Sequence, residues 1–314
     1  KKFTKNPLVS ALLLVVSVAF VVMMHGVMLD IPFLAFFLLS IAMFVYGSDL
    51  NNRYLLALGS VFGGFAYLTK YSGIVLIPIL IAYAMLKKNF RSLIYLIIPI
   101  LLIVLWNLYT FVIYGAPHNS ETLGWLLKSQ NSFRAESLLI RLLTNVLYIG
   151  GATIFPLMLL YPFLIDNKNK LALIAATLAA SILSVMLFFI SKTFAFRYTI
   201  PQLILFVFLF STGLFFLFII ARHYSKIWPE LFKSNSMLHN DQNSNSLFLF
   251  LWFIIAFLFI STLAGGAVRY ITVLTPPMIM IYLNVIDDYK ILNSKKFKNF
   301  IFLGLASTSL LSIV

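Results

Sequence analysis

A cation stands next to a tyrosine at the edge of an apolar segment in Lys70-Tyr71, Arg197-Tyr198 and Arg269-Tyr270. Lysine offers a point charge and arginine a planar fork to phosphate oxygens, and a tyrosine hydroxyl adds a donor at the same depth. Such pairs could hold a lipid phosphate or diphosphate at a membrane surface. They could equally be interfacial anchors, because snorkelling cations and belt tyrosines are common at the ends of membrane helices.

A single carboxylate, Asp30, stands just before Pro32 at the start of another apolar segment. Aspartate at this position could cap the helix, with Pro32 tolerated in its first turn. Alternatively, Asp30 could face the same cavity as Lys70, as a polar contact for substrate or as a metal ligand. His25 could join it on a divalent cation, but two ligands are too few to define a metal site. A divalent metal ion is therefore the one cofactor that the sequence leaves open.

The segments that position these residues are apolar enough to cross a membrane. Of the 314 residues, 62% are hydrophobic and 10% are charged, whereas soluble domains average about 45–50% and 25%. A spanning helix needs about 20 mostly apolar residues, which predicts an all-α, multi-pass bundle of about 10–11 spans in a single transmembrane domain. The predicted spans are residues 8–24, 31–47, 53–69, 72–86, 92–113, 138–165, 171–190, 199–221, 247–264 and 270–286, with an eleventh beginning at Phe300.

Lysine and arginine are distributed unequally over the alternate ends of these spans. Sixteen of the 23 fall on one side and seven on the other, and the seven include Lys70, Arg197 and Arg269. Because cytoplasmic loops carry the excess of positive charge, we expect the sixteen-charge side to be cytoplasmic. Lys70 and Asp30 are then extracytoplasmic, in a protein of the cell membrane. This placement also accounts for the formal charge of +14 without a nucleic-acid partner.

Two polar stretches are expected outside the membrane. Residues 115–137 fall on the outer side, where apolar residues at helical spacing favour a short interfacial helix. Residues 233–246 are polar and low in complexity, which predicts a flexible cytoplasmic loop. The chain begins with Lys1 and ends inside an apolar run, which indicates a fragment of a longer protein.

The order of motifs around Asp30 and Lys70 resembles a known family. Asp30-x-Pro32-Phe-Leu-x-Phe-Phe is followed by Gly59-x-x-x-Gly63-x-x-x-x-Leu68-Thr69-Lys70-Tyr71-Ser-Gly73-x-x-x-x-Pro78, then by Trp106, Gly115 and an Arg-Tyr-x-x-Pro element. This order resembles membrane glycosyltransferases of the GT-C fold, and most closely the branch of protein O-mannosyltransferases and the aminoarabinose transferase of lipid A. The likeness covers roughly residues 5–290, with the second half similar mainly in hydropathy.

The resemblance implies an enzyme that transfers a sugar from a polyprenyl phosphate or diphosphate to a protein, lipid or glycan acceptor on the outer side, with inversion. In that family an aspartate of the first outer loop is the general base, and we expect this loop to precede Lys1. Asp30 matches the second acidic residue, which helps to form the polar or metal-binding part of the catalytic site. Lys70 matches the lysine that contacts the donor phosphate, and either Arg197 or Arg269 matches a late phosphate-binding arginine.

Two other functions fit the same residues. A flippase or transporter of lipid-linked saccharides would also need outer cations for phosphate, but it should show charged residues near mid-span and broken helices in corresponding halves. Neither feature is evident in the sequence. A catalytically inactive relative of the transferases is the remaining alternative.

Overall fold

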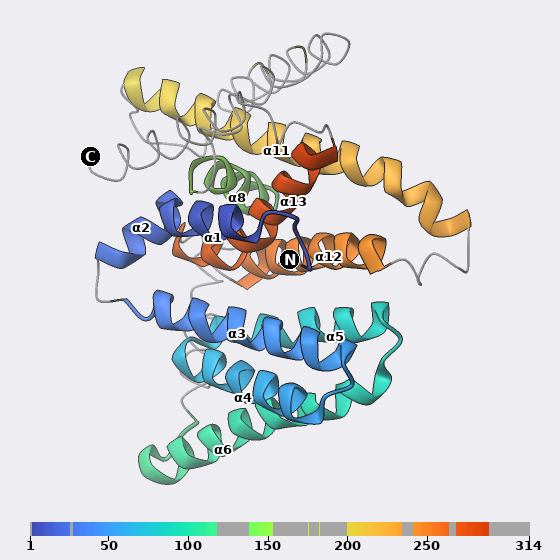
Figure 1. Cartoon of the computed structure of the whole chain (residues 1–314). Coiled ribbons are helices and arrows are strands. Elements are labelled where there is room, and N and C mark those ends of the chain that lie inside the picture. The colour runs from blue at the N-terminus through green and yellow to red at the C-terminus, as the bar shows by residue number, and fades with distance from the viewer. Residues whose placement is uncertain are drawn as a thin grey trace. The chain divides into compact units, whose positions relative to one another are not determined.

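Helices make up most of the part of the chain that the computed structural model describes, and no strand occurs in that part (Figure 1). The described residues are 2–25, 28–117, 138–152, 175, 182, 200–233, 241–263 and 268–288. Within them, four helical stretches are long and apolar enough to cross a membrane: Asp30–Asp49, Phe90–Tyr114, Phe206–Ser225 and Asn243–Thr262. The protein is therefore an all-α, multi-pass membrane protein, as the sequence predicts.

Some predicted elements lie outside the described residues. They are the interfacial helix within residues 115–137, the second half of the span at residues 138–165, nearly all of the span at residues 171–190 and the span from Phe300. The predicted loop at residues 233–246 lies partly outside them, but helix α12 begins at Asp241, so the last six residues of this stretch are helical.

The chain divides into two compact units. The first unit comprises Lys1–His25, Leu142–Met237 and Thr275–Val314, and the second comprises Gly26–Arg141 and Leu238–Leu274. The helices of the first unit are α1 (Pro7–Val16), α2 (Val18–His25), most of α8 (Leu138–Ala152), α11 (Ile200–Lys233) and α13 (Thr275–Asp288).

The first predicted span, residues 8–24, is not one continuous helix. Ser17 has an extended backbone, with φ −60° and ψ 140°, and it separates α1 from α2. Its hydroxyl donates to the Leu14 carbonyl at 2.7 Å and accepts from the Phe20 amide at 3.4 Å. The serine side chain thus replaces backbone hydrogen bonds that the break removes, which is how serine competes with helical structure.

Helix α13 ties the beginning of the chain into the first unit. It contacts α1 and α11, and its Asn284 donates a hydrogen bond to the Phe3 carbonyl at 3.0 Å. Lys5 forms an ion pair with Asp287 at the end of the same helix, and the lysine side chain is 70% exposed.

The second unit contains the motifs that the sequence analysis singled out. Its elements are α3 (Asp30–Asp49), α4 (Arg53–Thr69), the short 3-10 helix η1 (Tyr71–Val75), α5 (Leu76–Leu86), the 3-10 helix η2 (Phe90–Leu96), α6 (Ile97–Tyr114), α12 (Asp241–Leu263) and the 3-10 helix η5 (Val268–Val273). Helices α3 and α4 form an antiparallel hairpin, and α4 also packs against α6 (Figure 1).

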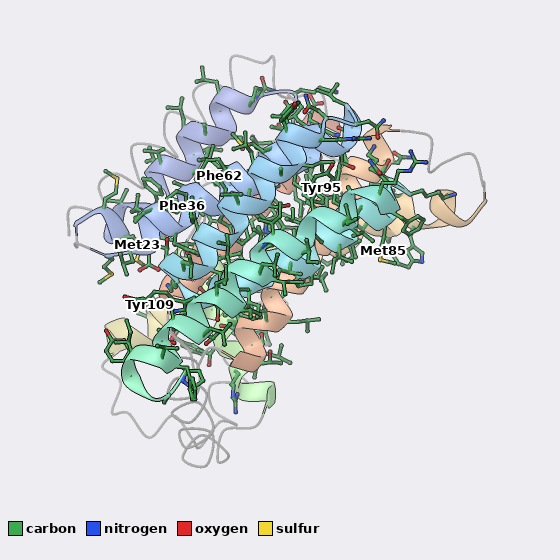
Figure 2. All side chains as sticks on the ribbon, turned by 90° about the horizontal axis from the view of Figure 1, so that it is seen from below. Met23, Phe36, Phe62, Met85, Tyr95 and Tyr109 are labelled. Carbon is green, nitrogen blue, oxygen red and sulfur yellow. The ribbon has the colours of Figure 1, made fainter. Side chains whose placement is uncertain are left out.

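The α3–α4 contact is close because a glycine lies at its centre. The Ser40 hydroxyl of α3 donates to the Gly59 carbonyl of α4 at 2.6 Å. A Cβ at Gly59 would lie 2.7 Å from the Phe44 backbone nitrogen, so a side chain there would force the helices apart. On one side of the hairpin Phe36 stacks on Phe62, with ring centroids 6.0 Å apart (Figure 2).

Charged residues of the second unit lie at both of its ends. The 20 residues of α3 rise about 30 Å, which is the thickness of a bilayer hydrocarbon core. Asp30 and Lys70 lie at one end, called the Lys70 end below, and Arg53 and Lys87 lie at the other, called the Lys87 end. The charge distribution in the sequence predicts this sorting of the cations, while the membrane side of each end stays a prediction.

We expect Gly59→Ala to lower the thermal midpoint more than Gly64→Ala does. At Gly59 the new methyl group meets the backbone of α3, and overpacking of this kind costs about 1–3 kcal/mol. At Gly64 the nearest atom is a terminal methyl group of Leu102, a flexible side chain that can turn away. Thermal unfolding of both variants in one detergent measures the difference, and equal midpoints would contradict the close α3–α4 contact.

Candidate functional site

The candidate site is built around an ion pair between Lys70 and Asp30. The Lys70 ammonium donates to Oδ1 of Asp30, and the two side chains are only 17% and 6% exposed. The Lys70 ammonium also lies 5.8 Å from the centre of the Phe33 ring, one turn along α3. The structure thus brings together Asp30 and Lys70, which one alternative of the sequence analysis placed at the same cavity.

Lys70 is held at a break between two helices. Its backbone is extended, with φ −155° and ψ 125°, and α4 ends at the preceding residue. Its amide still donates to the Ala66 carbonyl at 3.0 Å, and its own carbonyl accepts from Gly73 at 2.8 Å. A Cβ at Gly73 would lie 2.7 Å from the backbone of α4, so this glycine allows the turn to close tightly. The Ser-Gly step that follows Lys70 in the sequence therefore fixes the lysine at the end of α4.

Asp30 does not cap α3. Leu29 occupies the cap position and the helix start has no side-chain cap hydrogen bond, because the Asp30 carboxylate bonds to Lys70 instead. As the first residue of α3, Asp30 still places its negative charge near the positive end of the helix dipole. The capping role considered for Asp30 is thus absent from the structure, and the carboxylate faces Lys70.

Aromatic side chains surround the Lys70 turn. The Tyr71 hydroxyl accepts a hydrogen bond from Nε1 of Trp106 at 3.3 Å, and the Tyr71 ring lies 5.3 Å from that of Tyr67. Trp106 in turn stacks on Tyr109, with ring centroids 5.8 Å apart. These contacts tie α6 to the Lys70 turn.

Arg269 and Tyr270 belong to an element that reaches the same end of the second unit. Helix α12 starts near Lys87, where Ser244 accepts from the lysine ammonium at 3.4 Å. Its 23 residues rise about 35 Å, so its last turn and the following η5 lie at the Lys70 end. Consistent with this, η5 packs against α3, and α12 contacts η1. Arg197 and Tyr198 lie outside the described residues.

The structure adds two polar groups at this end that the sequence analysis did not select. Nη1 of Arg141 donates to the Thr262 carbonyl in the last turn of α12 at 3.4 Å. The Ser72 hydroxyl, two residues after Lys70, is buried without a hydrogen-bond partner. Six other side-chain polar atoms of the described residues are buried in the same way, so it is the position of Ser72 beside Lys70 that draws attention to it. A serine in a turn carries no sequence signal for burial of its hydroxyl.

The described residues supply only Asp30 as a ligand for the divalent metal ion that the sequence leaves open. The Asp30 carboxylate is already paired with an ammonium group, whose charge opposes a second cation. No group of three or more histidine, cysteine, aspartate or glutamate residues that could hold a metal occurs in the described part of the chain. The side chain of His25 lies outside it.

Comparison with known proteins supports the resemblance over the first third of the chain. Residues 2–114 match the family model of the dolichyl-phosphate-mannose-protein mannosyltransferases, and this range includes Asp30 and Lys70. No curated protein sequence and no solved structure matches the chain. The match confirms the GT-C resemblance for this part and supports a membrane glycosyltransferase of the mannosyltransferase type.

We expect Asp30 and Lys70 to be strongly coupled in stability. Asp30→Asn or Lys70→Met alone leaves one buried charge without this partner, and breaking a buried pair costs about 3–5 kcal/mol. The double variant should lose less than the sum of the single variants, with a coupling of about 0.5–3 kcal/mol. Reversible unfolding in detergent of the four proteins of this cycle measures the coupling.

The pair of Lys5 and Asp287, whose lysine is exposed, provides a control for this cycle. Lys5→Met and Asp287→Asn should be additive within about 1 kcal/mol, because an ion pair with an exposed lysine contributes little. Equal coupling in both cycles would contradict a special role for burial at Asp30 and Lys70.

Proposed function

We propose that this protein is a glycosyltransferase that takes a sugar from a polyprenyl-phosphate-linked donor and passes it, with inversion, to an acceptor on the outer face of the cell membrane. The buried ion pair of Asp30 and Lys70 carries the proposal. It combines a fixed cation with a carboxylate at one end of a membrane helix bundle, and both residues lie within the stretch that is similar to mannosyltransferases.

Lys70 binds the donor phosphate in this proposal. An ammonium group has three donors, so it can bond a phosphate oxygen while one donor stays on Asp30. When the bond between sugar and phosphate breaks, negative charge grows on the leaving phosphate, and a cation that is already in place stabilises it without reorganisation. The low exposure of Lys70 strengthens this effect because water screens the charge less.

Asp30 belongs to the acidic part of the catalytic site and holds the Lys70 ammonium in position. The Ser72 hydroxyl and the Tyr71 ring lie on the same turn and could contact the phosphate or the sugar. The polyprenyl tail would lie against the apolar surface of the spans. Such a tail keeps the reacting phosphate at the depth of the Lys70 end, so donor and acceptor meet at a fixed level of the membrane.

Arg269 is the second phosphate-binding cation of the proposal. It belongs to η5, which follows α12 and packs against α3, the helix that begins with Asp30. Arginine adds a bidentate contact that a lysine lacks. Arg197, the other candidate, is then an interfacial anchor.

We predict that Lys70→Ala and Asp30→Asn each lower the rate of sugar transfer at least a hundredfold, the scale of losing one preorganised charge contact. The measurement is transfer of radiolabelled mannose from a polyprenyl phosphate to peptide, lipid or glycan acceptors by the complete protein in proteoliposomes. Arg53→Gln is the control, because Arg53 is exposed and lies at the other end of α4. Wild-type rates in both site variants would refute the transferase assignment of these residues, and movement of the intact donor across the bilayer without transfer would favour a flippase.

Arg269→Gln and Arg197→Gln should have unequal effects on the same reaction. Loss of a phosphate contact at Arg269 should raise the KM for the donor and lower kcat, whereas loss of an anchor at Arg197 should leave both nearly unchanged. Kinetics with varied donor concentration separate the two variants. A large effect of Arg197→Gln alone would make Arg197, and not Arg269, the phosphate-binding residue. Negligible effects of both substitutions would mean that both arginines are interfacial anchors.

A further inference from the structure

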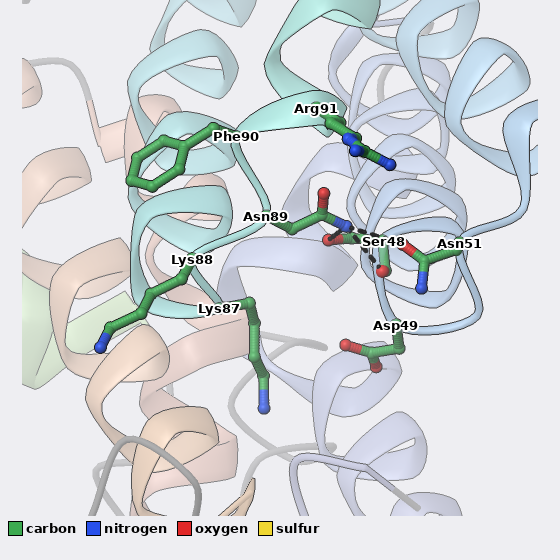
Figure 3. Close-up of a pocket in the computed structure, with 8 residues that line it drawn as sticks. All are labelled: Ser48, Asp49, Asn51, Lys87, Lys88, Asn89, Phe90 and Arg91. Carbon is green, nitrogen blue, oxygen red and sulfur yellow. Dashed lines mark hydrogen bonds between the residues drawn. The ribbon is translucent and has the colours of Figure 1, made fainter. Parts of the chain in front are cut away.

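A second polar site occupies the Lys87 end of the second unit, away from Asp30 and Lys70. It is a pocket of ≈ 690 Å³ lined by Ser48, Asp49, Asn51, Lys87, Lys88, Asn89, Phe90 and Arg91 (Figure 3). The lining residues come from two turns, one between α3 and α4 and one between α5 and η2, and from the end of α3 and the start of η2 beside them. Its volume is within the range of pockets that bind small ligands, about 300–1,000 Å³.

The side chain of Asn89 locks the two turns together. Its amide nitrogen donates to the Ser48 carbonyl at 2.9 Å, to the Ser48 hydroxyl at 3.2 Å and to the Asn51 side chain at 3.4 Å (Figure 3). Asn51 and Lys88 have positive φ angles of 51° and 53°, which few residues other than glycine adopt. Two left-handed turns held by one bridging amide make a preformed wall, so a ligand would not have to order it.

The charge of the pocket is positive. Lys87, Lys88 and Arg91 bring three cations, and Asp49 is the single carboxylate of the lining. Asp49 accepts a hydrogen bond from the Tyr83 hydroxyl at 2.6 Å, which partly satisfies its charge. An anion would therefore be attracted to this pocket, and the arginine fork suits phosphate oxygens.

The surroundings of the pocket are apolar and exposed. Leu50, Tyr54, Met85 and Phe90 are between 58% and 83% exposed, and they belong to the same two turns or to the residues beside them. A soluble phosphate would gain nothing from these side chains, whereas the acyl chains of a lipid would cover them. The pocket also lies about 30 Å from Asp30 along α3, so it meets the opposite interface of the bilayer, at the level of the lipid phosphates.

We propose that this pocket binds the phosphate headgroup of an anionic membrane lipid in the leaflet opposite the Lys70 site, which the charge distribution predicts to be the cytoplasmic one. Arg91 contacts the phosphate, and Lys87, whose ammonium points to the other side of the Asn89 bridge (Figure 3), adds to the positive charge of the pocket. Asn89 shapes the wall, and Phe90 and Tyr54 contact the acyl chains. Basic pockets between membrane helices on the cytoplasmic side bind phosphate headgroups in this manner. The site does not depend on the proposed transferase reaction.

The test compares lipids with the same acyl chains and different headgroups. The purified full chain in detergent is titrated with phosphatidylglycerol, with phosphatidylcholine and with inorganic phosphate, and the apparent dissociation constant is taken from the rise in thermal midpoint. We expect phosphatidylglycerol to bind at least tenfold more tightly than either alternative. Equal binding of phosphatidylcholine would overturn the headgroup site, and equal binding of inorganic phosphate would overturn its assignment to a lipid.

Two variants and a matched control identify the pocket. Arg91→Gln and Lys87→Gln should each weaken phosphatidylglycerol binding about fivefold, the usual effect of one cation near an anionic surface. Arg53→Gln removes the same charge from an exposed position at the same end that does not line the pocket, and it should leave binding unchanged. If Lys87→Gln unfolds the protein, the Arg91→Gln variant alone tests the pocket, because Arg91 is exposed. Equal weakening in Arg53→Gln and Arg91→Gln would overturn the pocket in favour of general surface charge.

Discussion

The ion pair between Asp30 and Lys70 is the interaction on which the second unit depends. Taking one charge out of water costs several kcal/mol, and the cost is also high inside a bilayer, so neither side chain would be buried at this depth without the other. The pair joins the first residue of α3 to the break after α4. It therefore fixes the helix start and the turn that carry Phe33, Tyr71 and Ser72, and it does so at the end where the phosphate chemistry is proposed.

The membrane accounts for the arrangement of the remaining polar groups. Helices of about 30 Å separate two interfaces, and the second unit places different chemistry at each of them. At the Lys70 end one partly buried cation is paired with a buried carboxylate, which suits a reacting phosphate in a site with little water. At the Lys87 end Arg91 and Lys88 are exposed beside apolar side chains, which suits binding of a headgroup without reaction. In the two proposals, the same helices thus present one interface for chemistry and one for lipid.

The sequence predicts the helical class and the two key residues because charges are rare among apolar segments, so Asp30 and Lys70 stand out. It does not predict their pairing, since 40 positions separate them and only the packing of α3 on α4 brings them together. The break at Ser17 was also missed, because a lone serine in an apolar run more often stays helical by bonding within its own turn. The Asn89 bridge and the buried Ser72 hydroxyl depend on turn geometry, which hydropathy does not report.

The most direct test of the central claim is an experimental structure of the complete protein in a lipid nanodisc with a bound polyprenyl phosphate. The account predicts that the phosphate lies within hydrogen-bond distance of the Lys70 ammonium, while that ammonium still contacts the Asp30 carboxylate. A phosphate bound elsewhere in the protein, with Lys70 contacting only Asp30 and lipid, would contradict the account and leave the buried pair with a structural role alone.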